Sequence, residues 1–299
     1  MSLTTIVQEW LKGAGGRGAA ALTARRHIAA ETGADVHAIC ATVSADPFFA
    51  VPARTTAGHE LVPGAVLTRG DEVHAYYEGR SGSYVVRSSA QLTSIATDWY
   101  VFNETVATLL GTGIVDGVDA SGREWQVQSA VLFPTSADGI AGEICITRRP
   151  MGDVIREIEG GAGGPAAAGA APAGVGSAVG VGSAAVSGGL LDRLSTAARA
   201  GDWDAVGAAL SPSHSLAIRT GAGAVRTATG REASAAAFVA LFAGADDLGV
   251  LVRVATDWYA FAEYVATLTG GGWRRLAVIH AVDDGQVSGS FGYGGSFSS

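Results

Sequence analysis

The chain has 299 residues, of which 48% are hydrophobic and 16% are charged, and its formal net charge is −8. This length is enough for two ordinary domains. The acidic balance argues against a nucleic-acid partner, which requires a basic surface for its phosphates, and against adsorption to anionic membranes.

The sequence indicates a reduced, cytoplasmic setting. Two cysteines, Cys40 and Cys145, do not make a disulfide framework. The start, MSLTTIVQEWLKG, lacks a basic region followed by an apolar stretch, so no signal peptide is expected. No apolar run approaches the length that spans a membrane, so no membrane partner is expected.

A low-complexity segment predicts two domains. Residues 160–189 contain only Gly, Ala, Ser, Pro and Val, a composition typical of a flexible linker. This linker separates residues 1–159, the first half, from residues 190–299, the second half. Its glycine-rich runs follow no predicted strand, so they do not indicate a dinucleotide site.

Both halves repeat one order of elements. In the first half, Val36, Ile39 and Val43 have helical spacing, and the FFAV that follows predicts a strand. The second half repeats this order in GDWDAVGAAL and LAI. A second helix is expected at TRGDEVHAYYEG in the first half and at TGREASAAAFVALF in the second. Each half closes with a predicted hairpin, whose turns are the Asp-Gly pairs at 138–139 and 284–285.

A strand that precedes each hairpin is nearly duplicated. Residues 96–111 read ATDWYVFNETVATLLG, and residues 255–270 read ATDWYAFAEYVATLTG. Strand side chains alternate between two faces. The face that begins with Asp98, Tyr100, Phe102 and Glu104 is identical in both copies through Thr108. Three of the four differences lie on the other face, where Val101, Asn103 and Thr105 are replaced by Ala260, Ala262 and Tyr264.

This order of elements resembles the nuclear-transport-factor-2-like superfamily, which includes ketosteroid isomerase and the SnoaL-like polyketide cyclases. The residues that carry the resemblance are GDWDAVGAAL with its following strand, the TGRE helix start and FNETVATL. The resemblance implies an α+β fold of two tandem cone-shaped domains, each a curved antiparallel sheet wrapped on helices around an apolar pocket. The resemblance implies that residues 1–159 form a SnoaL-like domain with an extra N-terminal helix, and that residues 190–299 form the second such domain.

The duplicated strand allows two interpretations. In the first, the identical face packs the two halves together as an internal pseudo-dimer, and the changed face lines two different pockets. In the second, the identical acids form two duplicated active sites, since buried carboxylates in a contact would need partners. We favour the first, and leave open whether the pseudo-dimer forms a further homodimer.

The resemblance also carries over candidate catalytic positions. The resemblance places His27 at the position of a hydrogen-bond donor on the first helix. The simpler interpretation is that His27, which follows Arg25 and Arg26, lies on the surface. The resemblance places Tyr77 at the position of a tyrosine that supports the donor. A purely structural role in the core, or a place in the pocket wall, is an equally simple interpretation. The position of the general base in ketosteroid isomerase is occupied by Val51, which cannot take a proton. The positions at which other members of the superfamily carry a catalytic acid or base hold no such residue here.

We therefore expect the first half to bind a small, largely apolar or aromatic molecule, with the second half as its pseudo-dimer partner. The alternative is a cofactor-independent lyase, isomerase or cyclase in which His27 shuttles a proton while Tyr77 and Asn103 orient a carbonyl. A third possibility is a purely structural pair without a ligand. The six histidines are scattered, so neither a metal nor a cofactor is expected. The expected ligand-binding residues are Trp99, Val101, Thr105, His74, Glu143 and, in the second half, Tyr264.

Overall fold

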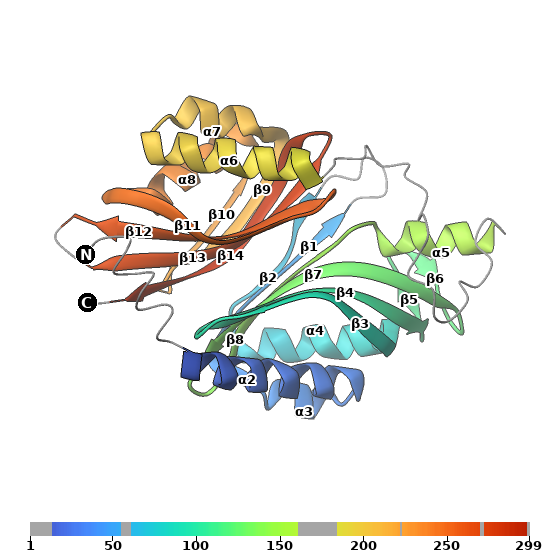
Figure 1. Ribbon diagram of the computed structural model, residues 1–299. Helices are drawn as coiled ribbons and strands as arrows, with labels where there is room; N and C mark the ends of the chain where they lie inside the picture. Colours follow the sequence, from blue (N-terminus) through green and yellow to red (C-terminus); the bar gives the residue numbers. More distant parts are fainter. Residues whose placement is uncertain (1–13, 55–60, 161–183, 222, 270–271, 298–299) are drawn as a thin grey trace. The chain divides into compact units, whose positions relative to one another are not determined.

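The computed structural model describes residues 14–54, 61–160, 184–221, 223–269 and 272–297 (Figure 1). These residues form two compact units, one built mainly from the first half and one mainly from the second. Most of the predicted linker, and residues 1–13 of the region expected to carry an extra helix, lie outside the described residues. The last part of the predicted linker, residues 184–189, is the beginning of a helix.

The first half is a six-stranded sheet with helices packed against it (Figure 1). The strand order is β2-β1-β8-β7-β4-β3. The strands are β1 (Val43–Arg54), β2 (Leu61–Leu67), β3 (Tyr84–Ala96), β4 (Tyr100–Gly111), β7 (Glu124–Ser136) and β8 (Gly139–Thr147), with a short hairpin of β5 (Ile114–Val115) and β6 (Val118–Asp119). The helices are α2 (Ala14–Thr32), α3 (Val36–Cys40), α4 (Gly70–Ser83) and α5 (Met151–Glu159).

The second half repeats this architecture with the strand order β10-β9-β14-β13-β12-β11. Its strands are β9 (Leu210–Arg219), β10 (Val225–Thr229), β11 (Ala245–Ala255), β12 (Tyr259–Leu268), β13 (Trp273–Asp283) and β14 (Gln286–Phe297), and its helices are α6 (Ala184–Ala200), α7 (Trp203–Ala209) and α8 (Arg231–Phe242). Two six-stranded sheets with packed helices confirm the predicted α+β class.

The same local chemistry starts the short helix of each half. The Asp35 carboxylate accepts a hydrogen bond from the backbone N–H of Ala38 at 3.1 Å, and Asp202 does the same for Ala205 at 3.0 Å. Each aspartate satisfies an N–H group that the first helical turn leaves without a partner. The GDW and ADV motifs of the sequence are therefore helix starts.

Each sheet is mixed, whereas an antiparallel sheet was expected. Strand β1 pairs parallel with β8, and β9 pairs parallel with β14, while the other central pairs are antiparallel. In each half the last strand of the closing hairpin, β8 or β14, lies next to the first strand and runs in the same direction.

The predicted hairpin turn of the second half is confirmed in detail. Asp284 and Gly285 have φ values of 48° and 73°, so both lie in the left-handed region. A two-residue hairpin loop of type I′ requires this conformation at both positions, which is why Asp-Gly pairs favour it.

Two further features differ from the sequence prediction. Val43, expected at the end of a helix, begins β1. The edge strands β3 and β11 were not predicted, because β3 is exposed over much of its length and bulges at two places interrupt its alternation. Among the described helices, none has the length and apolar character needed to cross a membrane.

Candidate functional site

The first half contains a cavity of about 630 Å³. Helices α2 and α4 and strands β4, β7 and β8 all contribute to its wall. Most of the wall is apolar, and it includes Ile28, Leu109, Val127, Val131, Phe133 and Met151. Polar and charged residues also line it, among them Glu31, Arg80, Asn103, Thr105, Asp116, Ser129 and Glu143.

The duplicated strand presents its changed face to this cavity. Asn103 and Thr105 line the cavity from β4. Glu104 points to the opposite face, where its Oε1 accepts a hydrogen bond from Gln128 Nε2 at 2.8 Å. In the second half, Glu263 forms an ion pair with Arg275. Glu104 and Glu263 thus each have a partner within their own half, and Glu104 does not line the cavity, while the pseudo-dimer contact stays a prediction.

A buried chain of hydrogen bonds ends at the cavity. The Tyr77 hydroxyl donates to Glu143 Oε2 at 2.6 Å, and His27 Nε2 lies 3.1 Å from the same hydroxyl. His27 Nε2 is 3.7 Å from Glu143 Oε2. His27 is 0% exposed and Glu143 is 4% exposed, and of the three residues only Glu143 lines the cavity. The surface interpretation of His27 is therefore wrong.

His27 contacts a hydroxyl group at each ring nitrogen. Its Nδ1 lies 2.6 Å from the Thr42 hydroxyl, which donates to the backbone oxygen of Ile39 at 2.6 Å. Its Nε2 contacts the Tyr77 hydroxyl, which donates to Glu143. Tyr77 therefore bridges the His27 ring and the Glu143 carboxylate.

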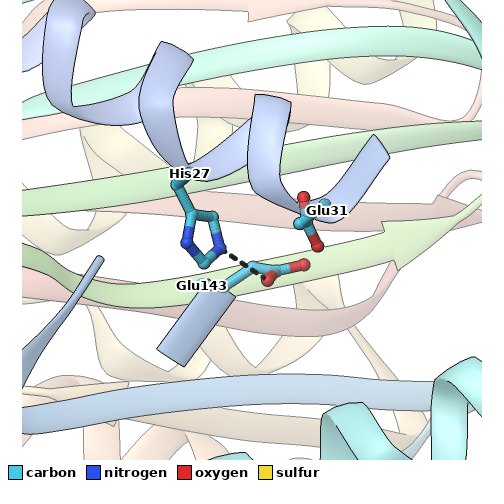
Figure 2. Close-up of side chains that lie close together, drawn as sticks. All are labelled: His27, Glu31 and Glu143. Carbon is cyan, nitrogen blue, oxygen red and sulfur yellow. Dashed lines mark ion pairs between the residues drawn. The ribbon is translucent and has the colours of Figure 1, made fainter. Parts of the chain in front are cut away.

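A buried ion pair lies beside His27, Tyr77 and Glu143. Arg80 on α4 pairs with Glu31 on α2, and both side chains are largely buried. The Arg80 guanidinium lies 5.3 Å from the Tyr77 ring centroid and 5.7 Å from that of Tyr84. Figure 2 shows Glu31 one turn after His27 on α2, with both side chains directed toward Glu143.

The pKa of Glu143 reflects these neighbours. Burial raises the pKa of this carboxyl, but the nearby His27, the positive charge of Arg80 and the hydrogen bond from Tyr77 together outweigh burial, so its pKa lies below the usual value. Tyr77 is affected in the opposite sense, since burial and the nearby Glu143 charge raise its pKa well above the ordinary value. At neutral pH the cavity therefore faces an ionised carboxylate supported by a neutral tyrosine.

The far wall of the cavity carries neutral donors. Asn103 Oδ1 accepts a hydrogen bond from Gln91 Nε2 at 2.7 Å, which orients the amide. Among the described residues no group pairs with Asn103 Nδ2, so this donor is available to the cavity. Thr105 and Ser129 share a hydrogen bond of 3.0 Å between their hydroxyl groups.

His27, Glu31 and Glu143 also have the spacing of a metal-binding group, since one donor atom from each lies within 4.8 Å of the others. Imidazole and carboxylate are common ligands of divalent cations. Arg80 already pairs with Glu31, and the Tyr77 hydroxyl already donates to Glu143. Two of the three candidate ligands are therefore engaged by groups of the protein.

The second half has a neutral cluster in the corresponding place. Glu143 pairs with Phe49 between β8 and β1, and Ser290 pairs with Leu216 between β14 and β9, so Ser290 occupies the position of Glu143. The Ser290 hydroxyl lies 3.0 Å from His214 Nε2 and 2.9 Å from His280 Nδ1. Burial lowers the pKa of both histidines to about 3, so neither is charged at neutral pH.

The other predicted residues do not meet at the cavity. Tyr264 is packed in the core of the second half, and its hydroxyl bonds His280 Nε2 at 2.9 Å. Val101 packs in a cluster with Ala20, Ala24 and Phe133. Trp99 is buried edge-on against Tyr100, and His74 is exposed on α4 beside Glu78. Among the described residues, the cavity thus collects Asn103, Thr105 and Glu143 from the predicted set, with His27 and Tyr77 directly behind Glu143.

The sequence analysis did not single out Glu31 and Arg80. Glu31 follows His27 by four residues on α2, and Arg80 follows Tyr76 and Tyr77 on α4 at helical spacing. Residues spaced by three or four positions share one face of a helix. That spacing was the available signal for both.

No family model and no curated protein matches the chain. Solved structures do match it. A candidate polyketide cyclase from Silicibacter sp. TM1040 is 14% identical with a TM-score of 0.36, over 45% of this chain and 90% of that protein. An NTF-2-like protein of unknown function from Burkholderia xenovorans LB400 is 16% identical with a TM-score of 0.34, over 38% and 87%. A ketosteroid isomerase-like protein from Erwinia carotovora atroseptica SCRI1043 is 17% identical with a TM-score of 0.32, over 43% and 92%. These neighbours come from the superfamily that the sequence resembles.

Proposed function

We propose that the first half binds a small, largely apolar molecule. The observation that carries this proposal is the cavity of about 630 Å³, whose wall is largely apolar in surface and also carries polar and charged groups. Sites for small organic molecules have this size and this composition. The ligand would lie between Glu143 and the donors of Asn103, Thr105 and Ser129.

The second half would serve as a packed partner. Its positions corresponding to the cavity wall carry Ala262, Tyr264 and Ala266, which belong to its buried core. The internal pseudo-dimer and the domain limits 1–159 and 190–299 belong to this proposal. Cys40 and Cys145 are both free thiols, which supports action in a reduced compartment such as the cytoplasm.

Calorimetric titration with 2-ethylnaphthalene tests the binding proposal. We expect saturable binding to the wild-type chain with one site. The matched variant is Thr105→Tyr, which introduces the side chain that the second half carries at this position and fills the cavity. Binding should be lost in this variant while the far-UV circular dichroism is retained. Equal binding by both proteins, or no binding by the wild type, would contradict the proposal.

A second function, cofactor-independent proton transfer of the lyase, isomerase or cyclase type, is favoured by the chain of Glu143, Tyr77 and His27. An ionised carboxylate at the cavity wall is a general base for a carbon acid. Glu143 would take a proton from a carbon of the ligand, and the resulting carboxylic acid would return this proton to the ligand at a different atom. The Tyr77 hydroxyl, which contacts both Glu143 and His27, would hold the carboxyl group in place.

Hydrogen–deuterium exchange tests this second function without a known substrate. The methyl protons next to the carbonyl of 2-acetylnaphthalene exchange slowly in D₂O, and NMR follows the loss of their signal. We expect the wild-type chain to accelerate exchange well above the buffer rate. Glu143→Gln should abolish the acceleration while the ketone still binds, whereas exchange at the buffer rate with bound ketone would contradict proton transfer.

A further inference from the structure

We propose that Arg80 binds the oxygen of a ligand carbonyl, so that the cavity selects neutral ketones over hydrocarbons of the same shape. This inference rests on the proposed function, because it names the ligand class of the same cavity. It also moves the carbonyl-orienting role, which the sequence had suggested for Tyr77 and Asn103, to a residue on the same helix as Tyr77.

Arg80 has donors to offer. It lines the cavity, and its Nη1 donates to Glu31. Among the described residues, no other group accepts a hydrogen bond from this guanidinium. A guanidinium carries five N–H groups in a planar fork, so at least one edge of the fork remains available to a ligand oxygen.

Arg80 is also held in place. Its guanidinium packs near the rings of Tyr77 and Tyr84, and its side chain is 15% exposed. Glu31 holds one end of the fork through the buried ion pair. A donor that is fixed before the ligand arrives loses little freedom on binding, so more of its interaction contributes to affinity.

Tyr77 cannot take this role in the hydrogen-bond arrangement of the structure. Its hydroxyl proton is used on Glu143, and the hydroxyl does not line the cavity. Asn103 has an available donor, but it lies on β4, and β7 separates β4 from β8, which carries Glu143. At about 4.8 Å between neighbouring strands, Asn103 is roughly 10 Å across the sheet from Glu143.

Arg80 lies on the Glu143 side of the cavity. Its guanidinium is 5.3 Å from the ring centroid of Tyr77, whose hydroxyl contacts Glu143. Its partner Glu31 has a carboxylate oxygen within 4.8 Å of one from Glu143. A ketone whose oxygen meets Arg80 therefore places the neighbouring carbon toward the carboxylate.

The charges specify a neutral carbonyl. A ligand carboxylate at this place would meet two ionised carboxylates, Glu143 and Glu31, and only one guanidinium. A ketone brings no charge in the ground state. When Glu143 takes a proton from the adjacent carbon, the electron pair of the C–H bond moves to form an enolate, whose negative oxygen faces Arg80. Returning the proton from Glu143 to carbon restores the ketone.

Calorimetric titration with three matched probes tests this inference: 2-acetylnaphthalene, 2-ethylnaphthalene and 2-naphthoate. We expect the wild-type chain to bind the ketone roughly tenfold to a hundredfold more tightly than the hydrocarbon, the range of a hydrogen bond to a charged group. The carboxylate should bind more weakly than the ketone. The hydrocarbon reports on the cavity alone, so it separates this inference from the proposed function.

Variants assign the preference to Arg80. Because Arg80→Met leaves Glu31 buried without its partner, the test variant is Arg80→Met combined with Glu31→Gln, and Glu31→Gln alone is the control. The double variant should bind ketone and hydrocarbon equally, whereas the control should keep the preference. Equal binding of the two probes by the wild type, a preference that survives the double variant, or tighter binding of the carboxylate would overturn the inference. Failure of the hydrocarbon to bind any folded form would instead overturn the proposed function.

Discussion

The two halves of this chain share one fold, and they differ in what fills the space between the sheet and its helices. In the first half this space is a cavity with Glu143, Arg80 and Glu31 in its wall. In the second half the corresponding positions are neutral or apolar. Ser290 stands in place of Glu143, and Tyr264 in place of Thr105 fills the interior.

This difference shows how one copy of a duplicated domain can keep a cavity while the other copy fills the corresponding space with side chains. The face of the duplicated strand that carries Asp98 and Glu104 is unchanged, whereas the cavity face differs at three positions. Thr105 leaves room beside Ser129, but Tyr264 brings a ring that packs against Phe242 and a hydroxyl that bonds His280. One half thus retains a space for a ligand, and the other closes that space with its own side chains.

The largest effect is expected when the side chain that fills the second half is removed. Tyr264→Ala should destabilise this half by about 3–5 kcal/mol, because a buried aromatic ring leaves a cavity and His280 loses its partner. Urea unfolding followed by circular dichroism measures the change. Thr105→Ala, at the corresponding position beside the existing cavity, is the control and should cost less than about 1 kcal/mol. Equal costs at the two positions would remove the distinction between a filled and an open half.

Acid should also distinguish the halves. His214 and His280 have pKa values of about 3 when folded, against about 6.5 when unfolded, so below pH 6.5 only the unfolded state gains their protons. Their stabilising contribution is complete above pH 6.5, and it is lost as the pH falls, by up to about 1.4 kcal/mol per pH unit for each histidine. The pKa of Glu143 is lowered in the folded state, so its contribution to stability is lost only below the usual carboxyl pKa of about 4.3.

Urea midpoints between pH 7 and pH 5 test this window. As the pH is lowered, the urea midpoint of the second half should begin to fall at a higher pH than the urea midpoint of the first half. His74→Gln, which removes an exposed histidine, is the control and should leave the dependence unchanged. A second half whose midpoint does not change over this range would show that its histidines are not buried in the neutral form.

The smallest of these effects concerns the hydroxyl that bridges His27 and Glu143 in the first half. Tyr77→Phe removes the group between His27 and Glu143, so we expect a loss of about 1–3 kcal/mol in the first half alone. Tyr76→Phe is the control, because among the described residues the Tyr76 hydroxyl has no hydrogen bond. Equal stability of the two variants would mean that the bridge does not support the site.

The sequence predicted the parts of the fold that local chemistry determines. The TGRE helix start, the Asp-Gly turn at Asp284 and the repeated strand all follow from short motifs, and each lies where it was expected. The edge strand β3 did not follow, because its bulges break the alternation that identifies a strand. The parallel pairing of β1 with β8 depends on contacts between distant segments, which local patterns do not encode.

The candidate site was predictable in part for the same reason. His27, Tyr77 and Glu143 were found one at a time, on three separate elements, and only the fold brings them within hydrogen-bond distance. His74 illustrates the limit of residue type alone. It shares α4 with the buried Tyr77 and Val73, but its own side chain is exposed.

The most direct test of the central claim is a crystal structure of the chain with 2-acetylnaphthalene. We predict that the ketone occupies the first-half cavity, with its oxygen at Arg80 and its ring against the apolar wall toward Asn103, and that the interior of the second half remains filled by Tyr264. Ketone bound in the interior of the second half, or a first-half cavity that stays without ligand at saturating concentration, would contradict the account.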